Sequence, residues 1–110
     1  MARERDIVVG RRGDSLTGKV REKQFEIKSD LGKVKVPTKK IAWVHFKNSP
    51  RLDSDEIWLV TGDRLSGNIS GKLISFKPDA GETLKIPCKA ILTLIVGARM
   101  GRGDKSLLSG

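Results

Sequence analysis

The stretch GDSLTGKV at residues 13–20 returns in similar form as GDRLSGNI at residues 62–69. Both copies read Gly-Asp-x-Leu-(Thr/Ser)-Gly-x-(Val/Ile), and residue 62 lies 49 positions after residue 13. The likeness continues downstream, where GKVKVP at residues 32–37 is answered by GETLKIP at residues 81–87. Because a fixed period of this size marks a repeated structural unit, the chain consists of one β-rich unit written twice.

The size of the two copies limits how each can be stabilised. A copy of about 45 residues is near the lower limit at which a domain holds a core by itself. The 110-residue chain has one Cys and one His, so neither an intrachain disulfide nor a His-based metal cluster is available. We therefore expect no metal and no cofactor, and we expect the copies to pack against each other or against other subunits.

The charge of the chain is strongly positive and unevenly placed. The formal net charge is +9, and residues 6–48 carry eleven Lys and Arg against five Asp and Glu. A basic surface favours polyanions such as nucleic acids. The alternative is that lysines keep a β-rich protein soluble and protect its edge strands. The amino terminus is charged without an apolar signal region, and no apolar run approaches a membrane span, so we expect a cytoplasmic protein with no membrane contact.

The pattern of apolar residues predicts short strands and almost no helix. Apolar and polar residues alternate with a period of two around Leu16, Phe25 and Val34, and the second copy repeats the pattern. Pro37 and Pro87 are followed by three residues that predict a tight turn before the last strand of each copy. Five short strands in each copy indicate a small SH3-like or Sm-like barrel, and the predicted fold class is all-β with two such barrels in tandem.

The predicted boundaries are a basic first barrel at 6–48, a linker at 49–55, a second barrel at 56–96 and a flexible tail at 97–110. Within the repeated motif, glycine suits a turn or a sharp bend, and an Asp after Gly at a turn bonds to nearby backbone amides. We assign these structural roles to Gly13, Asp14 and Gly18 in the first copy and to Gly62, Asp63 and Gly67 in the second.

The two copies resemble the Sm and Sm-like RNA-binding family. The Gly-x-x-Leu-x-Gly-x-(Val/Ile) run is similar to that family's first motif, which forms a bent second strand, and residues 36–44 and 86–94 are similar in spacing to its second motif. The resemblance covers most of residues 7–47 and 57–96. It implies a barrel whose fourth and fifth strands pair with neighbours into a homo-oligomeric ring, and a trimer of tandem barrels is the expected form.

The chain departs from the family at the RNA pocket. Members that bind RNA carry an Asp-x-x-x-Asn element after the first motif and an Arg-Gly or Lys-Gly pair in the second, which together form the base pocket. Here the segments 25–28 and 74–77 stand near the first element, and Pro37-Thr38 and Pro87-Cys88 replace the second. The residues that form the family's usual RNA pocket are therefore absent from this sequence.

No catalytic site is predicted. The GDSL run at residues 13–16 matches the signature of a serine esterase family, but that chemistry needs a His with an Asp close before it. The lone His45 has no such Asp, and Arg64 replaces the serine in the second copy. We therefore expect no enzyme activity.

The favoured function is nucleic-acid binding by the basic first copy, with RNA as the expected ligand. Lysines interleaved with an aromatic side chain can neutralise phosphates while the ring stacks on a base. The predicted contacts are Arg11, Arg12, Lys28, Lys33, Lys35, Lys39 and Lys40, with Trp43 as a stacking surface. Phe25 and Phe46 are expected in the core. The alternative is a scaffold protein whose barrels bind only protein partners.

Overall fold

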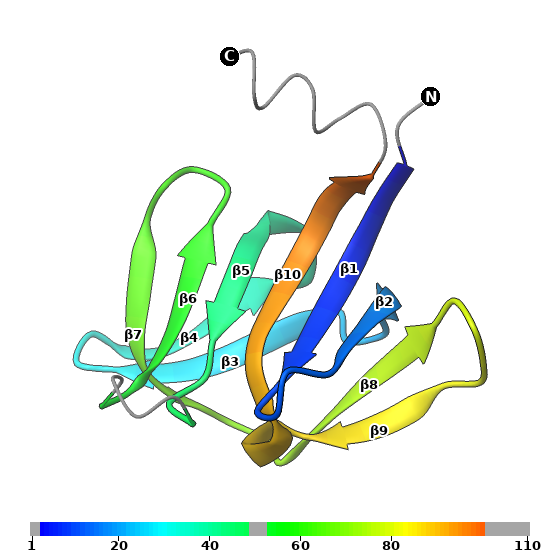
Figure 1. Cartoon of the computed structure of the whole chain (residues 1–110). Helices are drawn as coiled ribbons and strands as arrows, with labels where there is room; N and C mark the ends of the chain where they lie inside the picture. The colour runs from blue at the N-terminus through cyan, green and yellow to red at the C-terminus, as the bar shows by residue number, and fades with distance from the viewer. Residues whose placement is uncertain (1–2, 49–52, 101–110) are drawn as a thin grey trace.

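The structure is a computed structural model that describes residues 3–48 and 53–100 (Figure 1). The first copy forms β1 (Arg3–Gly10), β2 (Ser15–Val20), β3 (Gln24–Ser29), β4 (Gly32–Pro37), the 3-10 helix η1 (Thr38–Lys40) and β5 (Ile41–His45). The second copy forms β6 (Asp55–Leu59), β7 (Arg64–Ile69), β8 (Leu73–Pro78), β9 (Leu84–Pro87), the 3-10 helix η2 (Cys88–Ala90) and β10 (Ile91–Met100). The described residues contain no α-helix, and the predicted all-β class is confirmed.

The two short helices stand where the prolines predict tight turns. Pro37 and Pro87 are the last residues of β4 and β9, and each is followed by a single 3-10 turn. The N–H of Ile41 donates to the carbonyl of Thr38, and Ile91 repeats this contact with Cys88. Since proline has no N–H to donate, it ends the ladder and lets the chain reverse into the last strand of each copy.

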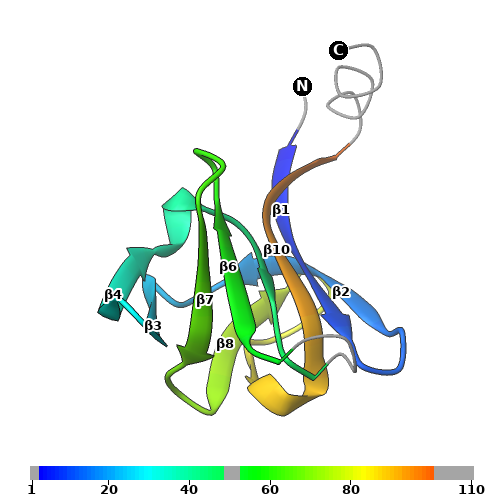
Figure 2. The same cartoon turned by 90° about the vertical axis from the view of Figure 1, so that its left-hand side faces the viewer.

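The ten strands form one curled antiparallel sheet. Their order is β4-β3-β7-β6-β5-β10-β1-β2-β8-β9, which leaves β4 and β9 at the two edges. Figure 1 shows the central strands running together while the β3–β4 and β8–β9 hairpins turn across them. Figure 2 shows η1 near the upper end of the turned view and η2 at its lower end.

The sheet joins the two copies by exchanging strands between them. β3 of the first copy pairs with β7 of the second, through Ile27 opposite Ile69, and β2 pairs with β8 through Val20 opposite Phe76. The fifth strands of the two copies, β5 and β10, pair with each other at the centre. Neither copy forms a sheet of its own, so this connectivity differs from the prediction of one barrel within 6–48 and another within 56–96. Periodicity predicts a strand but cannot specify which strand lies beside it.

Two glycines of the repeated motif allow the exchanged strands to approach closely. A Cβ atom on Gly18 of β2 would lie 2.0 Å from the carbonyl oxygen of Lys77 in β8. A Cβ on Gly67 of β7 would lie 2.0 Å from the carbonyl oxygen of Lys28 in β3. Neither glycine has a positive φ. Contact between backbones, and not a left-handed conformation, is therefore what requires glycine at both positions.

The other motif residues lie in the hairpin turns. Gly13 and Gly62 have φ values of +93° and +96°, in the region that favours glycine. The N–H of Gly13 donates to the carbonyl of Gly10 at 3.1 Å, and the backbone carbonyl of Asp14 accepts from the N–H of Gly10 at 2.7 Å. In the second copy the side chain of Asp63 accepts from the Thr61 hydroxyl at 2.9 Å. These contacts close the β1–β2 and β6–β7 turns.

Two buried carboxylates, 49 positions apart, clamp the central strands. Asp6 Oδ2 accepts from the N–H of Val20 at 2.7 Å and Oδ1 from the N–H of Gly97 at 2.8 Å. Asp55 accepts equivalent bonds from the N–H groups of Ile69 at 2.8 Å and Lys47 at 2.9 Å. Sequence analysis missed this pair, although the shared offset of 49 was a signal that could have found it. Charge-assisted bonds to backbone amides stabilise the buried carboxylates and fix three neighbouring segments together in each half.

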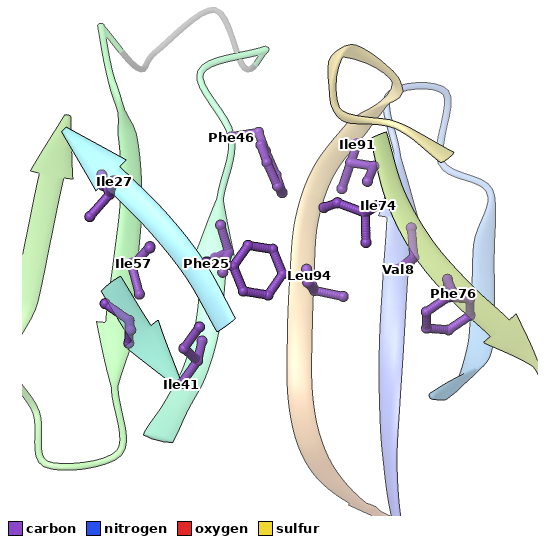
Figure 3. Packing of buried hydrophobic residues seen from close by; sticks show 12 residues of the cluster. Val8, Phe25, Ile27, Ile41, Phe46, Ile57, Ile74, Phe76, Ile91 and Leu94 are labelled. Carbon is purple, nitrogen blue, oxygen red and sulfur yellow. The ribbon is translucent and has the colours of Figure 1, made fainter. Parts of the chain in front are cut away.

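The hydrophobic core is one cluster that draws on both copies. Figure 3 shows Phe25 and Phe46 within the cluster, and they are 5% and 2% exposed, which confirms their predicted burial. The fully buried residues are Ile27, Ile41, Val44, Ile57, Phe76, Ile91 and Leu94. Each such side chain contributes about 1.5–3 kcal/mol of hydrophobic stabilisation. Because the cluster spans both copies, the copies form one cooperative unit.

Both ends of the second copy differ from the predicted boundaries, since β6 already begins at Asp55, within the predicted linker. β10 continues to Met100, where residues 98–100 pair with residues 3–5 of β1, so four residues assigned to the tail form strand. Residues 101–110 of the predicted tail and 49–52 of the predicted linker lie outside the described residues. Within the described part of the chain, no helix has the length and apolar character needed to cross a membrane.

Candidate nucleic-acid interface

Two grooves occupy equivalent places in the two halves of the sheet. The η2 groove has a volume of about 680 Å³ and lies between the end of β5, the β7–β8 connection and η2. The η1 groove has a volume of about 530 Å³ and lies between β2, the β2–β3 connection and η1. Each contains one of the buried aspartates, Asp55 or Asp6, in its wall. The repeat in the sequence therefore produces a repeated surface feature.

Three lysines line each groove. The η2 groove has Lys47, Lys72 and Lys89, and the η1 groove has Lys19, Lys23 and Lys39. All six side chains are exposed. No lysine within residues 5–48 and 53–97 forms an ion pair. Lys47 Nζ donates to Asn68 Oδ1 at 3.1 Å, a neutral partner, so no carboxylate of the described residues neutralises the positive charge of the grooves.

The carboxylates near the grooves bond to backbone amides and not to the lysines. Asp6 and Asp55 accept the bonds described above, and Glu22 Oε2 accepts from the N–H of Ser75 at 2.8 Å. The η1 groove contains Asp6 and Glu22, whereas the η2 groove contains only Asp55. With the same number of lysines and fewer carboxylates, the η2 groove is the more basic of the two.

The η2 groove also presents apolar surface. Phe46, Leu73 and Pro87 line it together with the lysines, and Leu73 is 52% exposed. The Asn48 amide donates to the carbonyls of Cys88 and Ile91, both at 2.7 Å, and so holds the end of β5 against η2. A groove with an apolar floor and a few placed polar groups suits a ligand with both an aromatic and a charged part.

The structure distributes the predicted nucleic-acid contacts over separate places. Lys39 lines the η1 groove, and the carbonyl of Lys40 accepts from the N–H of Val60 at 2.9 Å beside the β6–β7 turn. Arg11 and Arg12 lie with η2, where the Arg11 N–H donates to the Ala90 carbonyl at 3.0 Å. The remaining three, Lys28, Lys33 and Lys35, are exposed on the β3–β4 hairpin at the edge of the sheet. The predicted set does not form one surface.

Trp43 lies on the outer face of β5 in a row of packed side chains. Its ring stacks on Trp58 with centroids 5.4 Å apart and planes at 26°, and the Arg64 guanidinium lies 5.5 Å from the Trp58 ring centroid. Ile95 is opposite Trp43 on the other neighbouring strand. Because Trp58 covers one face of the Trp43 ring, the contact stabilises the outer face of the sheet. Because of this contact, only part of the Trp43 ring surface is available for the predicted stacking on a base.

Five of the six groove lysines lie outside the predicted set of contacts. Lys72 and Lys89 belong to the second copy, where the lower charge gave no prediction, whereas Lys19, Lys23 and Lys47 belong to the first copy and were not among the predicted contacts. Repetition was the better signal: Lys23 and Lys72 are 49 positions apart, and Lys39 and Lys89 are 50 apart. Equivalent basic positions in a repeat indicate a shared surface more directly than the charge of one copy.

The thiol of Cys88 is poorly suited to nucleophilic chemistry. Burial, together with the negative charges of Asp55 and Glu22, raises the pKa of the Cys88 thiol, and a protonated thiol is a poor nucleophile. His45 Nδ1 is hydrogen-bonded to the hydroxyl of Thr93 at 3.1 Å. Within the described residues, no three His, Cys, Asp or Glu side chains gather where they could hold a metal ion.

Comparison of the chain with models of protein families, with curated proteins and with solved structures found no match. The resemblance to the Sm and Sm-like family therefore stays a prediction that depends on the two sequence motifs.

Proposed function

We propose that the protein is a non-enzymatic, Sm-like nucleic-acid-binding protein that holds single-stranded RNA in its η1 and η2 grooves. The observation that carries the proposal is the repeated set of three exposed lysines without ion pairs around each groove. Phosphate groups bind such lysines and release condensed counterions, which supplies affinity without sequence specificity.

The sheet suits two small barrels formed by strand exchange. One half, β10-β1-β2-β8-β9, and the other, β5-β6-β7-β3-β4, have the same order when their strands are numbered within each copy. Each half would be a five-stranded Sm-like barrel that takes two strands from one copy and three from the other. This arrangement keeps the predicted barrel type while changing which residues compose each barrel.

The position of the grooves also supports RNA. Each lies between the residues that follow the first motif, such as Lys72, and the start of the second motif, such as Cys88 and Lys89. In the Sm and Sm-like family, elements at these two places together form the base pocket. The usual residues are absent here, but lysines and an apolar floor stand where the resemblance places the pocket.

Binding of a fluorescein-labelled ten-nucleotide uridine RNA, measured by anisotropy at 50 and 200 mM salt, tests the proposal. We expect binding that weakens at least tenfold between these salt concentrations, since each phosphate contact adds to the salt dependence. The double variant Lys72→Glu with Lys89→Glu should weaken binding more than tenfold. The matched control Lys77→Glu with Lys85→Glu changes the net charge equally on β8 and β9 and should weaken binding less than threefold.

No binding at 50 mM salt would reject nucleic-acid binding. Equal losses in the two double variants would reject the groove as the site, because charge alone would then explain the affinity.

A scaffold protein that assembles with itself is the second candidate function. The sheet edges β4 and β9 are open, whereas β5 and β10 each have neighbours on both sides. A ring, including the predicted trimer, would then pair β4 of one chain with β9 of the next and not the fourth strand with the fifth. Light scattering at micromolar concentration tests assembly, and a monodisperse monomer would reject it.

A further inference from the structure

The β3–β4 hairpin concentrates positive charge at one edge of the sheet. Lys28 on β3 is directly opposite Lys33 on β4, and Lys35 follows two residues along β4. All three side chains are exposed. Like charges directly opposite each other on neighbouring strands are destabilising. The hairpin therefore holds an unfavourable charge arrangement that an acidic partner would relieve.

The carboxylate nearest to these lysines in the sheet register is engaged elsewhere. Glu26 stands opposite Lys35, but its Oε2 accepts a hydrogen bond from the Ser70 hydroxyl at 3.2 Å. No ion pair joins Glu26 to Lys35. Within the described hairpin, the three lysines have no acidic partner.

The backbone of β4 is open at the same residues. The N–H of Thr38 donates to the Lys23 carbonyl at 2.9 Å, which fixes the alternation of bonded and non-bonded pairs along the hairpin. In this alternation Val34 and Val36 bond to β3, whereas Lys33 and Lys35 direct their N–H and C=O groups away from it. β4 is the edge of the sheet, so these groups have no strand beside them.

We propose that the β4 edge binds an extended acidic peptide as an added strand, with acidic residues opposite Lys33 and Lys35. Strand addition supplies main-chain hydrogen bonds, and alternate side chains supply specificity. An added strand also matches the two-residue spacing of the lysines, because alternate residues of an extended peptide lie on one face. Leu31, 86% exposed at the tip of the hairpin, offers an apolar contact beside this edge.

Charge and geometry favour this partner over a second copy or a nucleic acid. The other open edge, β9, also carries a lysine, Lys85, so pairing between copies would bring like charges together. A phosphate backbone could contact the lysines but could not complete the hydrogen-bond ladder that Lys33 and Lys35 leave open. The proposal is independent of RNA binding in the grooves.

The test uses the full-length protein and a fluorescein-labelled eight-residue peptide of alternating Glu and Val, measured by anisotropy. Lys33→Glu with Lys35→Glu should weaken its binding at least tenfold and should create binding of the alternating Lys and Val peptide. Lys72→Glu with Lys89→Glu, in the η2 groove, should change the affinity for the acidic peptide less than threefold.

Two methylated peptides separate strand addition from charge attraction. In an antiparallel added strand, residues opposite Lys33 and Lys35 would direct their N–H groups toward β4, so N-methylation of the glutamates should abolish binding. N-methylation of the valines, whose N–H groups would point away, should preserve it. Equal binding of both methylated peptides would overturn the proposal, and so would no binding of the unmodified peptide.

Two further results would assign the edge to another partner and overturn the proposal. In the first, the unchanged protein does not bind the acidic peptide, and the double variant Lys33→Glu with Lys35→Glu loses binding to the ten-nucleotide uridine RNA. In the second, the unchanged protein is an oligomer and the same double variant is a monomer. Far-ultraviolet circular dichroism of each variant checks that the sheet is intact.

Discussion

Replacing Gly18 by Ala tests the strand exchange directly. The added Cβ would lie 2.0 Å from the Lys77 carbonyl oxygen and 2.6 Å from the Pro78 Cα. Both are backbone atoms, so no side-chain rotation removes the overlap. A carbon and an oxygen atom approach to roughly 3.2 Å at closest, so β2 and β8 must separate by about 1 Å. The substitution therefore acts on the pairing that joins the two copies.

The size of the effect follows from that separation. A shift of about 1 Å lengthens an N···O distance from about 2.9 Å to about 4 Å, beyond a hydrogen bond. The affected bonds include those from the N–H of Asp79 to the Thr17 carbonyl at 2.9 Å and from the N–H of Arg21 to the Ser75 carbonyl at 2.8 Å, with the bonded pair of Lys19 and Lys77 between them. At about 1 kcal/mol for each bond, the loss is about 2–3 kcal/mol. Alanine offsets about 0.4–1 kcal/mol by restricting the unfolded chain. We expect a net destabilisation of about 2 kcal/mol, a large share of an ordinary folding free energy.

Urea unfolding followed by Trp fluorescence and by far-ultraviolet circular dichroism measures this change. Gly67→Ala, at the equivalent crossing, should give a similar loss. Gly81→Ala is the matched control, because nothing lies within 4 Å of its added Cβ and its φ is not positive. It should be neutral or slightly stabilising. If Gly18→Ala unfolded with the stability of the unchanged protein, the close approach of β2 to β8 would be refuted.

Two further predictions test the cooperation of the copies and the half-buried thiol of Cys88. Residues 1–50 alone should be unfolded or dimeric, because every strand pairing of the first copy other than the β1–β2 and β3–β4 hairpins is with a strand of the second copy. A monomer by light scattering that is folded by circular dichroism would contradict the exchange. The raised pKa of Cys88 means that the folded state holds the thiol proton more tightly than the unfolded state, whose thiol has a pKa of about 8.5. Its contribution to stability is therefore complete below that value and is lost as the pH rises through the folded pKa. The stability difference between the unchanged protein and Cys88→Ser should decrease from pH 8 to pH 10.5, and a pH-independent difference would contradict a raised pKa.

Local features of the fold were predictable because they depend on neighbouring residues. Alternation around Phe25 and Val34 predicts half-buried strands, and Pro37 with the three residues after it predicts the turn that becomes η1. Phe25 and Phe46 were predicted in the core, and both are buried. Each of these predictions depends on a periodic pattern or a turn signal that involves only a few consecutive residues.

The candidate site was less predictable because its residues are distant in sequence. Lys47 and Lys72 belong to different copies and meet only because the end of β5 lies against the segment that joins the exchanged strands β7 and β8. Because residues 6–48 carry an excess of positive charge, the nucleic-acid interface was predicted on the first copy. Asp6 and Asp55 resemble surface charges in the sequence, and only their burial and their bonds to backbone amides reveal their role.

The sequence alone shows that one β-rich unit occurs twice and that each copy has five short strands. These properties follow from local sterics and from the alternation of apolar side chains. Only the tertiary structure decided that β3 lies beside β7 and β8 beside β2. The two copies share their pattern of alternating apolar residues, so that pattern is compatible with both pairings. The choice between them depends on connections and packing across the whole sheet.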